Sequence, residues 1–239
     1  MQLEEYLTRD DRVVLPVGST EQHAYLSIET DNIIAERLAV EAADGLGVPV
    51  LPVLAYGVTG FVAFPGSPTL APATFASVVR DIVDSLCRQG FRRVLVANAH
   101  GGNTPEHSAI RTWIASHRDA ELVWHDVWDG PPDALAAEID AEFDHASWSK
   151  NFPWTRLPGV QIPSTRKPPV APPRVDTPER WREALVDGSF GGLYQRPDAE
   201  ALRVWEAAVE QLRERLENGW SRAGRGRAEP LVTDPAHRR

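Results

Sequence analysis

Glu21, His23 and Asp31 are the first side chains in this sequence whose types and spacing suit metal chemistry. Glu21 and His23 stand two residues apart, so in an extended segment both side chains leave the backbone on the same side. Asp31 follows at the expected first turn of a helix. Two carboxylates and an imidazole form a ligand set that Zn²⁺, Mn²⁺ or Fe²⁺ accepts. Taken alone the pattern is weak, and the alternative is a solvated loop whose acids cap a helix start.

A second candidate ligand, His100, stands in the glycine-rich segment NAHGGN, residues 98–103. Gly101 and Gly102 allow the backbone to turn sharply and to approach a ligand closely. A histidine in such a turn is more often an ordinary loop residue than a ligand. Here both candidate segments follow expected strands of one parallel sheet, whose carboxyl ends open at the same edge. We therefore expect His100 to lie near Glu21.

A third segment with chemical potential is DHASW, residues 144–148. Asp144 stands next to His145, and a neighbouring carboxylate can orient an imidazole or keep it charged. Trp148 offers an apolar or stacking wall. By itself this combination is common on protein surfaces.

The elements expected to position these residues alternate between strands and helices. Apolar runs with β-branched residues predict strands, and apolar residues at helical spacing predict helices. The expected strands are residues 13–17, 48–54, 93–97 and 121–127, and the expected helices are residues 32–45, 74–90, 105–117 and 133–143, with a last helix carrying the apolar stripe 202–216. The succession of strand, helix and strand is the unit of a parallel α/β sheet.

Length and composition favour one α/β domain over residues 1–220, followed by a flexible tail over residues 221–239. The chain has 239 residues, 42% of them hydrophobic, and a formal net charge of −9. Its acids are spread along the predicted helices, so no basic surface is available for nucleic acid. The single cysteine, Cys87, excludes an internal disulfide and favours a reducing compartment. No apolar window is long enough for a membrane span, so we expect a soluble cytoplasmic protein.

Several motifs in one order resemble the creatininase (creatinine amidohydrolase) family. They are VVLPVGSTEQH, TDNIIAERLA, the FPGSPTL loop, DIVDSLCRQGFRRVLVANAHGGN and DHASW, and they cover about residues 10–155. Members of this family include formamide hydrolases of flavin and deazaflavin biosynthesis and the peptidase of mycofactocin maturation. Together the motifs are far more specific than any one of them.

The resemblance implies a three-layer α/β/α sandwich with a mainly parallel sheet, assembled into homo-oligomers, usually hexamers. It also implies a centre of one or two divalent ions, Zn, Mn or Fe. By their positions in the motifs, the metal ligands would be Glu21, His23, Asp31 and His100, with Asp31 bridging two ions. His145 would assist proton transfer to the leaving nitrogen, and Asp144 matches an acidic residue proposed as a base.

The sequence departs from the family pattern in two places. Ala24, Tyr25 and Leu26 follow the first histidine, where relatives have a glycine and often a second histidine. Lys150 stands where many relatives place a glutamate that completes the second metal site, and an ammonium is repelled by a dication. The alternatives are a one-metal enzyme, a carbamylated Lys150, a chain that has lost activity, or a carboxylate from elsewhere such as Glu142. One ion is therefore expected, and the second is in doubt.

The first functional hypothesis is a metal-dependent amidohydrolase that cleaves a cyclic amide or formamide of a small molecule by metal-activated water. The backbone amides of Gly101 and Gly102 would bind the oxyanion, and Tyr56, Trp148 and Trp154 would line the substrate pocket. For each aromatic residue, ordinary core packing is the alternative. The rival hypotheses are a peptidase acting on a modified peptide and a catalytically silent oligomeric subunit.

Overall fold

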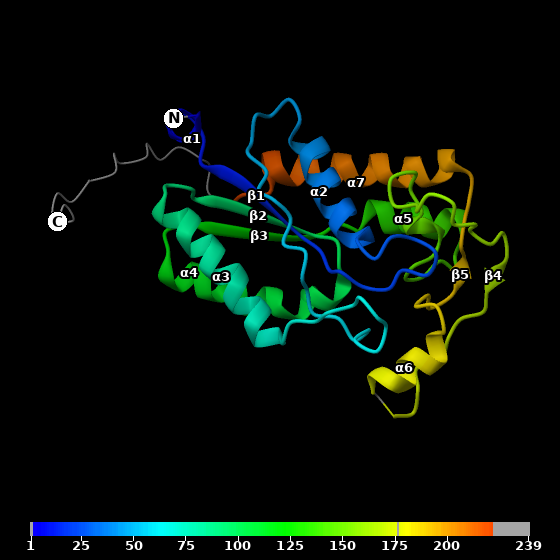
Figure 1. Ribbon diagram of the computed structural model, residues 1–239. Helices are drawn as coiled ribbons and strands as arrows, with labels where there is room; N and C mark the ends of the chain where they lie inside the picture. The colour runs from blue at the N-terminus through cyan, green and yellow to red at the C-terminus, as the bar shows by residue number, and fades with distance from the viewer. Residues whose placement is uncertain (1, 176, 222–239) are drawn as a thin grey trace.

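A three-stranded parallel sheet forms the centre of this computed structural model, which describes residues 2–175 and 177–221 (Figure 1). The strands are β1 (Arg12–Val17), β2 (Arg93–Asn98) and β3 (Glu121–Asp126), in the spatial order β1, β2, β3. Their register pairs Val14 with Leu95 and Leu95 with Val123. All three strands therefore end at the same edge of the sheet.

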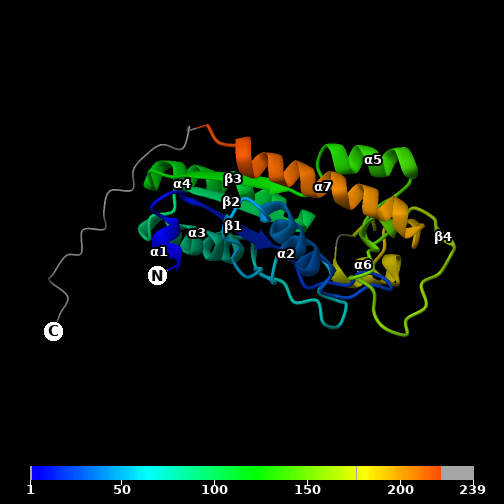
Figure 2. The same ribbon diagram turned by 90° about the horizontal axis from the view of Figure 1, so that it is seen from above.

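Helices cover both faces of this sheet (Figures 1 and 2). One face packs against α2 (Thr30–Ala43), α5 (Pro131–Ile139) and α7 (Asp198–Asn218), and the other against α3 (Pro72–Arg88) and α4 (His107–His117). The remaining elements are α1 (Gln2–Tyr6), η1 (Gly101–Glu106), η2 (Trp148–Lys150), α6 (Pro178–Leu185) and the antiparallel pair β4 (Arg166–Lys167) and β5 (Gly192–Leu193). The predicted three-layer α/β/α architecture is confirmed.

Side-chain alternation along the strands explains the two layers of core. Val14 of β1 belongs to the cluster under α2 and α7, whereas Val13 and Leu15 belong to the cluster under α3 and α4. Successive residues of a strand point to opposite faces, so a strand that is apolar at every position must be covered on both sides. Cys87 lies buried in the α3 side of this core.

The prediction of a regular strand over residues 48–54 is wrong, although this segment runs beside β1. Its backbone makes only isolated parallel bridges, between Val14 and Val50 and between Val17 and Leu54. Pro49 and Pro52 lack the N–H groups that a continuous ladder needs. The segment is therefore an interrupted edge of the sheet.

Other boundaries differ from the sequence pattern by a few residues. The helix expected over 133–143 ends at Ile139, and the helix expected from Pro105 is preceded by the 3₁₀ turn η1. Residues 222–239 of the expected tail lie outside the described part of the chain. Among the described residues, none of the helices has the length and apolar character that a bilayer crossing requires.

Candidate metal centre and active site

Three separate segments bring Glu21, Asp31 and His100 together at the carboxyl edge of the sheet. Glu21 lies in the loop after β1, Asp31 in the first turn of α2, and His100 just after β2. Nδ1 of His100 lies 3.0 Å from Oδ2 of Asp31 and 3.3 Å from Oε1 of Glu21. All three side chains are buried. The shared edge of a parallel sheet predicts this convergence, and their metal-binding role stays a prediction.

The ring of His100 is held with one nitrogen facing both acids. Its Nε2 lies 2.8 Å from the carbonyl oxygen of Val58, and Nε2 must carry the hydrogen because a carbonyl only accepts. Nδ1 is thereby directed at Glu21 and Asp31. Burial alone would lower the pKa of His100, but hydrogen bonds to Asp31 and Glu21 raise it to about 10.

This donor set fits a divalent cation. Two carboxylate oxygens and an imidazole nitrogen face one another, with their candidate ligand atoms within 4.8 Å. Such a group needs positive charge between its members, supplied by a second ring proton on His100 or by a metal ion. The hydrogen bond from Nε2 to a backbone carbonyl is also the usual second contact of a metal-binding histidine.

Glu21 is fixed by contacts on both of its oxygens. Oε2 accepts a hydrogen bond from the Thr59 hydroxyl, while Oε1 faces His100. Burial tends to raise the pKa of Glu21, but the hydrogen bond and charge of His100 lower it to about 2. The side chain is therefore an anion whose Oε1 faces the position between it and His100 where a cation would bind.

Asp31 divides its two oxygens between neighbouring positions. Oδ2 faces His100, and Oδ1 lies 3.2 Å from Nε2 of His23 and 2.6 Å from Nζ of Lys150. Burial would raise the pKa of Asp31, yet the charge of Lys150 and the hydrogen bond from His100 hold it well below its usual range. This split is the geometry expected of a carboxylate between two cations.

His145 reaches the same centre from the segment before η2. Its Nε2 lies 3.6 Å from Oε1 of Glu21, and its ring packs against the rings of His23 and Phe61 at centroid distances of 4.6 and 5.2 Å. Burial lowers the pKa of His145 to about 3, and the neighbouring His23 acts in the same direction. Asp144 accepts a hydrogen bond from the backbone amide of His145 at 2.7 Å and is exposed.

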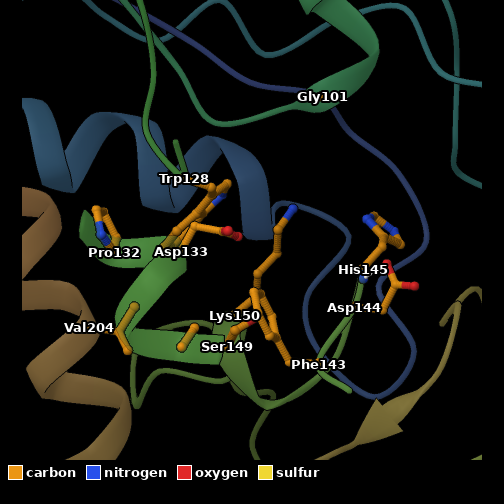
Figure 3. Close-up of a pocket in the computed structure, with 11 residues that line it drawn as sticks. Gly101, Trp128, Pro132, Asp133, Phe143, Asp144, His145, Ser149, Lys150 and Val204 are labelled. Carbon is orange, nitrogen blue, oxygen red and sulfur yellow. Dashed lines mark hydrogen bonds between the residues drawn. The ribbon is translucent and has the colours of Figure 1, made fainter. Parts of the chain in front are cut away.

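A cavity of about 320 Å³ lies beside His145 (Figure 3). Its walls come from the turn after β2, from the segments around α5 and η2, and from α7. The lining residues are Gly101, Trp128, Pro132, Asp133, Ala136, Phe143, Asp144, His145, Ser149, Lys150 and Val204. Trp128 and Phe143 were missed by the sequence reasoning, although Trp128 follows the carboxyl end of β3, where sites form in such sheets.

The aromatic residues predicted to line the pocket lie elsewhere. Trp148 is fully buried in the core under α2 and α7. Trp154 packs edge-on against Trp205, with the Arg37 guanidinium 3.9 Å from its ring centroid. Tyr56 is 52% exposed and does not line the cavity. For both tryptophans the alternative of core packing describes the structure.

Glu142, considered as a substitute ligand, is also outside the centre. Its side chain is 63% exposed and its Oε2 lies 3.0 Å from a guanidinium nitrogen of Arg166. A carboxylate that pairs with arginine at the surface cannot act as a ligand of a buried ion. Among the described residues, two groups have metal-ligand geometry, Glu21 with Asp31 and His100 and Glu21 with His23 and His145, and Glu142 belongs to neither.

Comparison with known proteins gives one family. The model of the creatininase family, described as creatinine amidohydrolase, matches residues 1–216. Creatinine amidohydrolase of Pseudomonas putida is 33% identical over 99 residues, which are 38% of this chain and 38% of that enzyme. Mycofactocin precursor peptide peptidase of Mycolicibacterium smegmatis is 36% identical over 99 residues, 38% of this chain and 40% of the peptidase. The chain thus covers less than half the length of either relative.

Solved structures show the same fold over a longer range. A crystal structure of creatinine amidohydrolase superimposes with a TM-score of 0.75 and 21% identity, covering 93% of this chain and 96% of that one. A mutant creatininase of zinc–zinc type gives a TM-score of 0.74 and 21% identity, covering 93% and 97%.

Proposed function

This chain belongs to the creatininase family of amidohydrolases, and from that premise we propose that it is a metal-dependent hydrolase of a small molecule. The bond cleaved is a non-peptide C–N bond, in a cyclic amide or a formamide. The observation that carries the proposal is the meeting of Glu21, Asp31 and His100 in one buried cluster whose neighbour, His145, lines a cavity.

We assign Glu21, Asp31 and His100 to one divalent ion, Zn, Mn or Fe, with His23 as the candidate ligand on the other side of Asp31. Carboxylate and imidazole donors suit these ions. When bound, the ion supplies Lewis acidity, which polarises a carbonyl group and makes water more acidic. Thr59 and the Val58 carbonyl keep Glu21 and His100 in place.

His145 is assigned to proton transfer. Its Nε2 is buried and, within the described part of the chain, has no hydrogen-bond partner. A neutral imidazole nitrogen at this position can accept a proton from the attacking water and deliver it to the departing nitrogen of the substrate. Asp144 contacts the backbone of His145, so we assign it to holding this turn instead of acting as the base.

The cavity suits a small substrate. A volume of about 320 Å³ is at the low end of small-molecule sites. Trp128 and Phe143 provide apolar walls, and Gly101, which follows His100, also lines the cavity. We assign the backbone amides of Gly101 and Gly102, at the start of η1, to the developing oxyanion.

A second candidate function is removal of residues from a modified peptide. The observation that favours it is the higher identity to the peptidase, 36% against 33% for creatinine amidohydrolase. Both relatives align over segments of 99 residues, so the difference amounts to a few positions. The small cavity favours the first function.

The test is hydrolysis by the metal-loaded protein. Cyclic amides, formamides and peptides ending in a modified residue would be incubated with protein loaded with Zn²⁺, Mn²⁺ or Fe²⁺, and products followed by mass spectrometry. We expect turnover of a cyclic amide or formamide that disappears on chelation and returns with metal. Cleavage of the peptides alone would favour the second function, and a metal-loaded protein without turnover would favour a silent subunit.

His145→Asn gives the matched test of the site. We expect it to keep its metal and lose about 10²- to 10⁴-fold in kcat, the usual worth of a positioned acid–base group. The control is His107→Asn, because His107 lies at the start of α4 and its ring contacts the Thr104 carbonyl. Equal activity of His145→Asn and the unsubstituted protein would remove His145 from the mechanism.

A further inference from the structure

The Lys150 amino group lies inside the buried ligand cluster. Its Nζ is 2.6 Å from Oδ1 of Asp31 and 3.2 Å from Nε2 of His23. Lys150 is the last residue of η2, and Figure 3 shows its side chain extending from this turn along the cavity. Only 8% of the residue is exposed.

Hydrogen-bond directions show that Lys150 already uses the lone pairs that a second ion would need. Nδ1 of His23 lies 3.2 Å from the Glu21 carbonyl oxygen, so Nδ1 carries the hydrogen. In the neutral ring Nε2, which lies 3.2 Å from both Nζ of Lys150 and Oδ1 of Asp31, then has the lone pair. That lone pair accepts from the Lys150 ammonium, which donates to Asp31 as well. The two atoms that would bind a second ion, Nε2 of His23 and Oδ1 of Asp31, are therefore already occupied by N–H groups of Lys150.

Charge gives a second, independent argument. A glutamate carboxylate at position 150 and one dication would together have a net charge of +1. The Lys150 ammonium has the same charge. Glu21 and Asp31 remain as the anions of the cluster, and each needs a cation nearby because both are buried. Lys150 with one metal ion therefore gives the same total charge as a glutamate at this position with two ions.

We propose that the Lys150 ammonium replaces the second metal ion, so that this centre binds one divalent cation between Glu21, Asp31 and His100. Asp31 then bridges a metal ion and an ammonium instead of two metals. A second dication is excluded because it would meet the fixed charge of Lys150 at a distance where repulsion in a buried site is large. The inference rests on the proposed function, since it requires that a metal be bound.

The experiment counts metal ions in the full chain. Unsubstituted protein, Lys150→Glu and Lys150→Gln would be saturated with Mn²⁺, freed of excess ion by gel filtration, and analysed by mass spectrometry of the metal. We expect one ion per chain in the unsubstituted protein and two in Lys150→Glu. We expect one in Lys150→Gln, because this variant removes the repulsion but lacks the carboxylate charge that a second buried dication needs. Electron paramagnetic resonance should show isolated Mn²⁺ in the first and a coupled pair in Lys150→Glu.

Each other outcome is decisive. Two ions in the unsubstituted protein, or one in a folded Lys150→Glu, would overturn the inference while leaving a metal enzyme in place. A second ion that enters only with added bicarbonate would identify a carbamylated lysine and equally overturn it. No ion in any variant would overturn the proposed function as well. If Lys150→Glu does not fold, anomalous scattering from the unsubstituted protein decides, with one peak expected, on the His100 side of Asp31.

Discussion

Asp31 is the residue on which the two halves of the centre depend, because each of its oxygens serves a different neighbour. Oδ2 faces His100 and Oδ1 faces His23 and Lys150. Its place in the first turn of α2 adds the positive end of a helix dipole to these contacts. One short side chain can therefore hold two positive charges apart inside the protein.

Gly102 sets the position of the His100 ring, and replacing it should weaken metal binding. A Cβ at Gly102 would lie 2.0 Å from the Val58 carbonyl oxygen and 2.5 Å from Nε2 of His100. Gly102→Ala must therefore shift the hydrogen bond that orients the ring, and we expect about 10- to 100-fold weaker metal affinity by calorimetry. Gly101→Ala is the matched control, because no atom lies within 4 Å of its added Cβ. Equal affinities for the two variants would contradict this account.

Ala24, which follows His23, has a φ of 50°, a left-handed conformation that is costly for any residue with a Cβ. Ala24→Gly should raise the free energy of unfolding by about 0.5 kcal/mol, since the relief of this strain exceeds the entropy that glycine loses on folding. Chemical denaturation measures the change. Ala35→Gly is the opposite control, because Ala35 lies buried within α2 and glycine there should destabilise by about 1 kcal/mol. A less stable Ala24→Gly would show that the conformation is not strained.

The sequence predicted the cluster of acids and imidazoles better than it predicted the substrate pocket. Glu21 and His100 could be placed together because each follows a parallel strand, and parallel strands share an edge. Position 150 stood out from the family pattern, but the contact of its Nζ with Asp31 depends on how η2 packs. The sequence does not distinguish a tryptophan of the core from one that lines a cavity. Tertiary packing places Trp148 in the core and Trp128 at the cavity.

The segment over residues 48–54 shows why an apolar composition alone wrongly predicted a regular strand. Its apolar residues do run beside β1, with the Leu51 amide donating to the Val14 carbonyl at 2.9 Å. Pro49 and Pro52 prevent the regular ladder. The irregular edge then leads into the loop that carries Val58 and Thr59 to the centre.

Asn103 joins the loops that carry the ligands, so its loss should affect both stability and metal binding. Its side chain donates to the Gly18 carbonyl at 3.0 Å and accepts from the Val58 amide at 2.9 Å. Asn103 is fully buried, so Asn103→Ala leaves two backbone groups without partners and should cost about 2–4 kcal/mol of unfolding free energy.

Gln195→Ala is the control for Asn103→Ala, because it removes one exposed hydrogen bond to the Ile162 carbonyl and should change stability by less than about 0.5 kcal/mol. Urea denaturation gives the stability of both variants, and calorimetry gives their metal affinity. If Asn103→Ala kept full stability and affinity, the loops would have to be held by other contacts.

The main body of the described molecule is a three-stranded sheet between two apolar clusters, and the site is built where the strands leave it. Val14, Leu95 and Val123 face the α7 layer, while Leu15 and Val96 face the α3 layer. Because both faces are filled by helices, the carboxyl edge remains the place where polar side chains from several segments can meet. Fold and site therefore follow from the same alternation of strands and helices.

His125 introduces a pH-sensitive group into this core. It lies in β3, paired with Ala97, and only 5% of it is exposed. Burial and then the charge of Arg215 on α7 lower the pKa of His125 from 6.5 to about 4. Between these values the unfolded chain binds the proton and the folded chain does not, so stability rises with pH through this window and is lost as pH falls towards 4.

The corresponding prediction is a flatter pH profile when this group is removed. From pH 7 to pH 4, His125 should contribute a loss on the order of 3 kcal/mol to the unfolding free energy, as its pKa shift implies. His125→Leu should lose less stability than the unsubstituted protein over that range, measured by urea denaturation at each pH. All other ionisable residues are common to the two proteins, so the difference between the two curves isolates His125. Parallel curves from pH 7 to pH 4 would mean that His125 takes up its proton equally well in the folded protein.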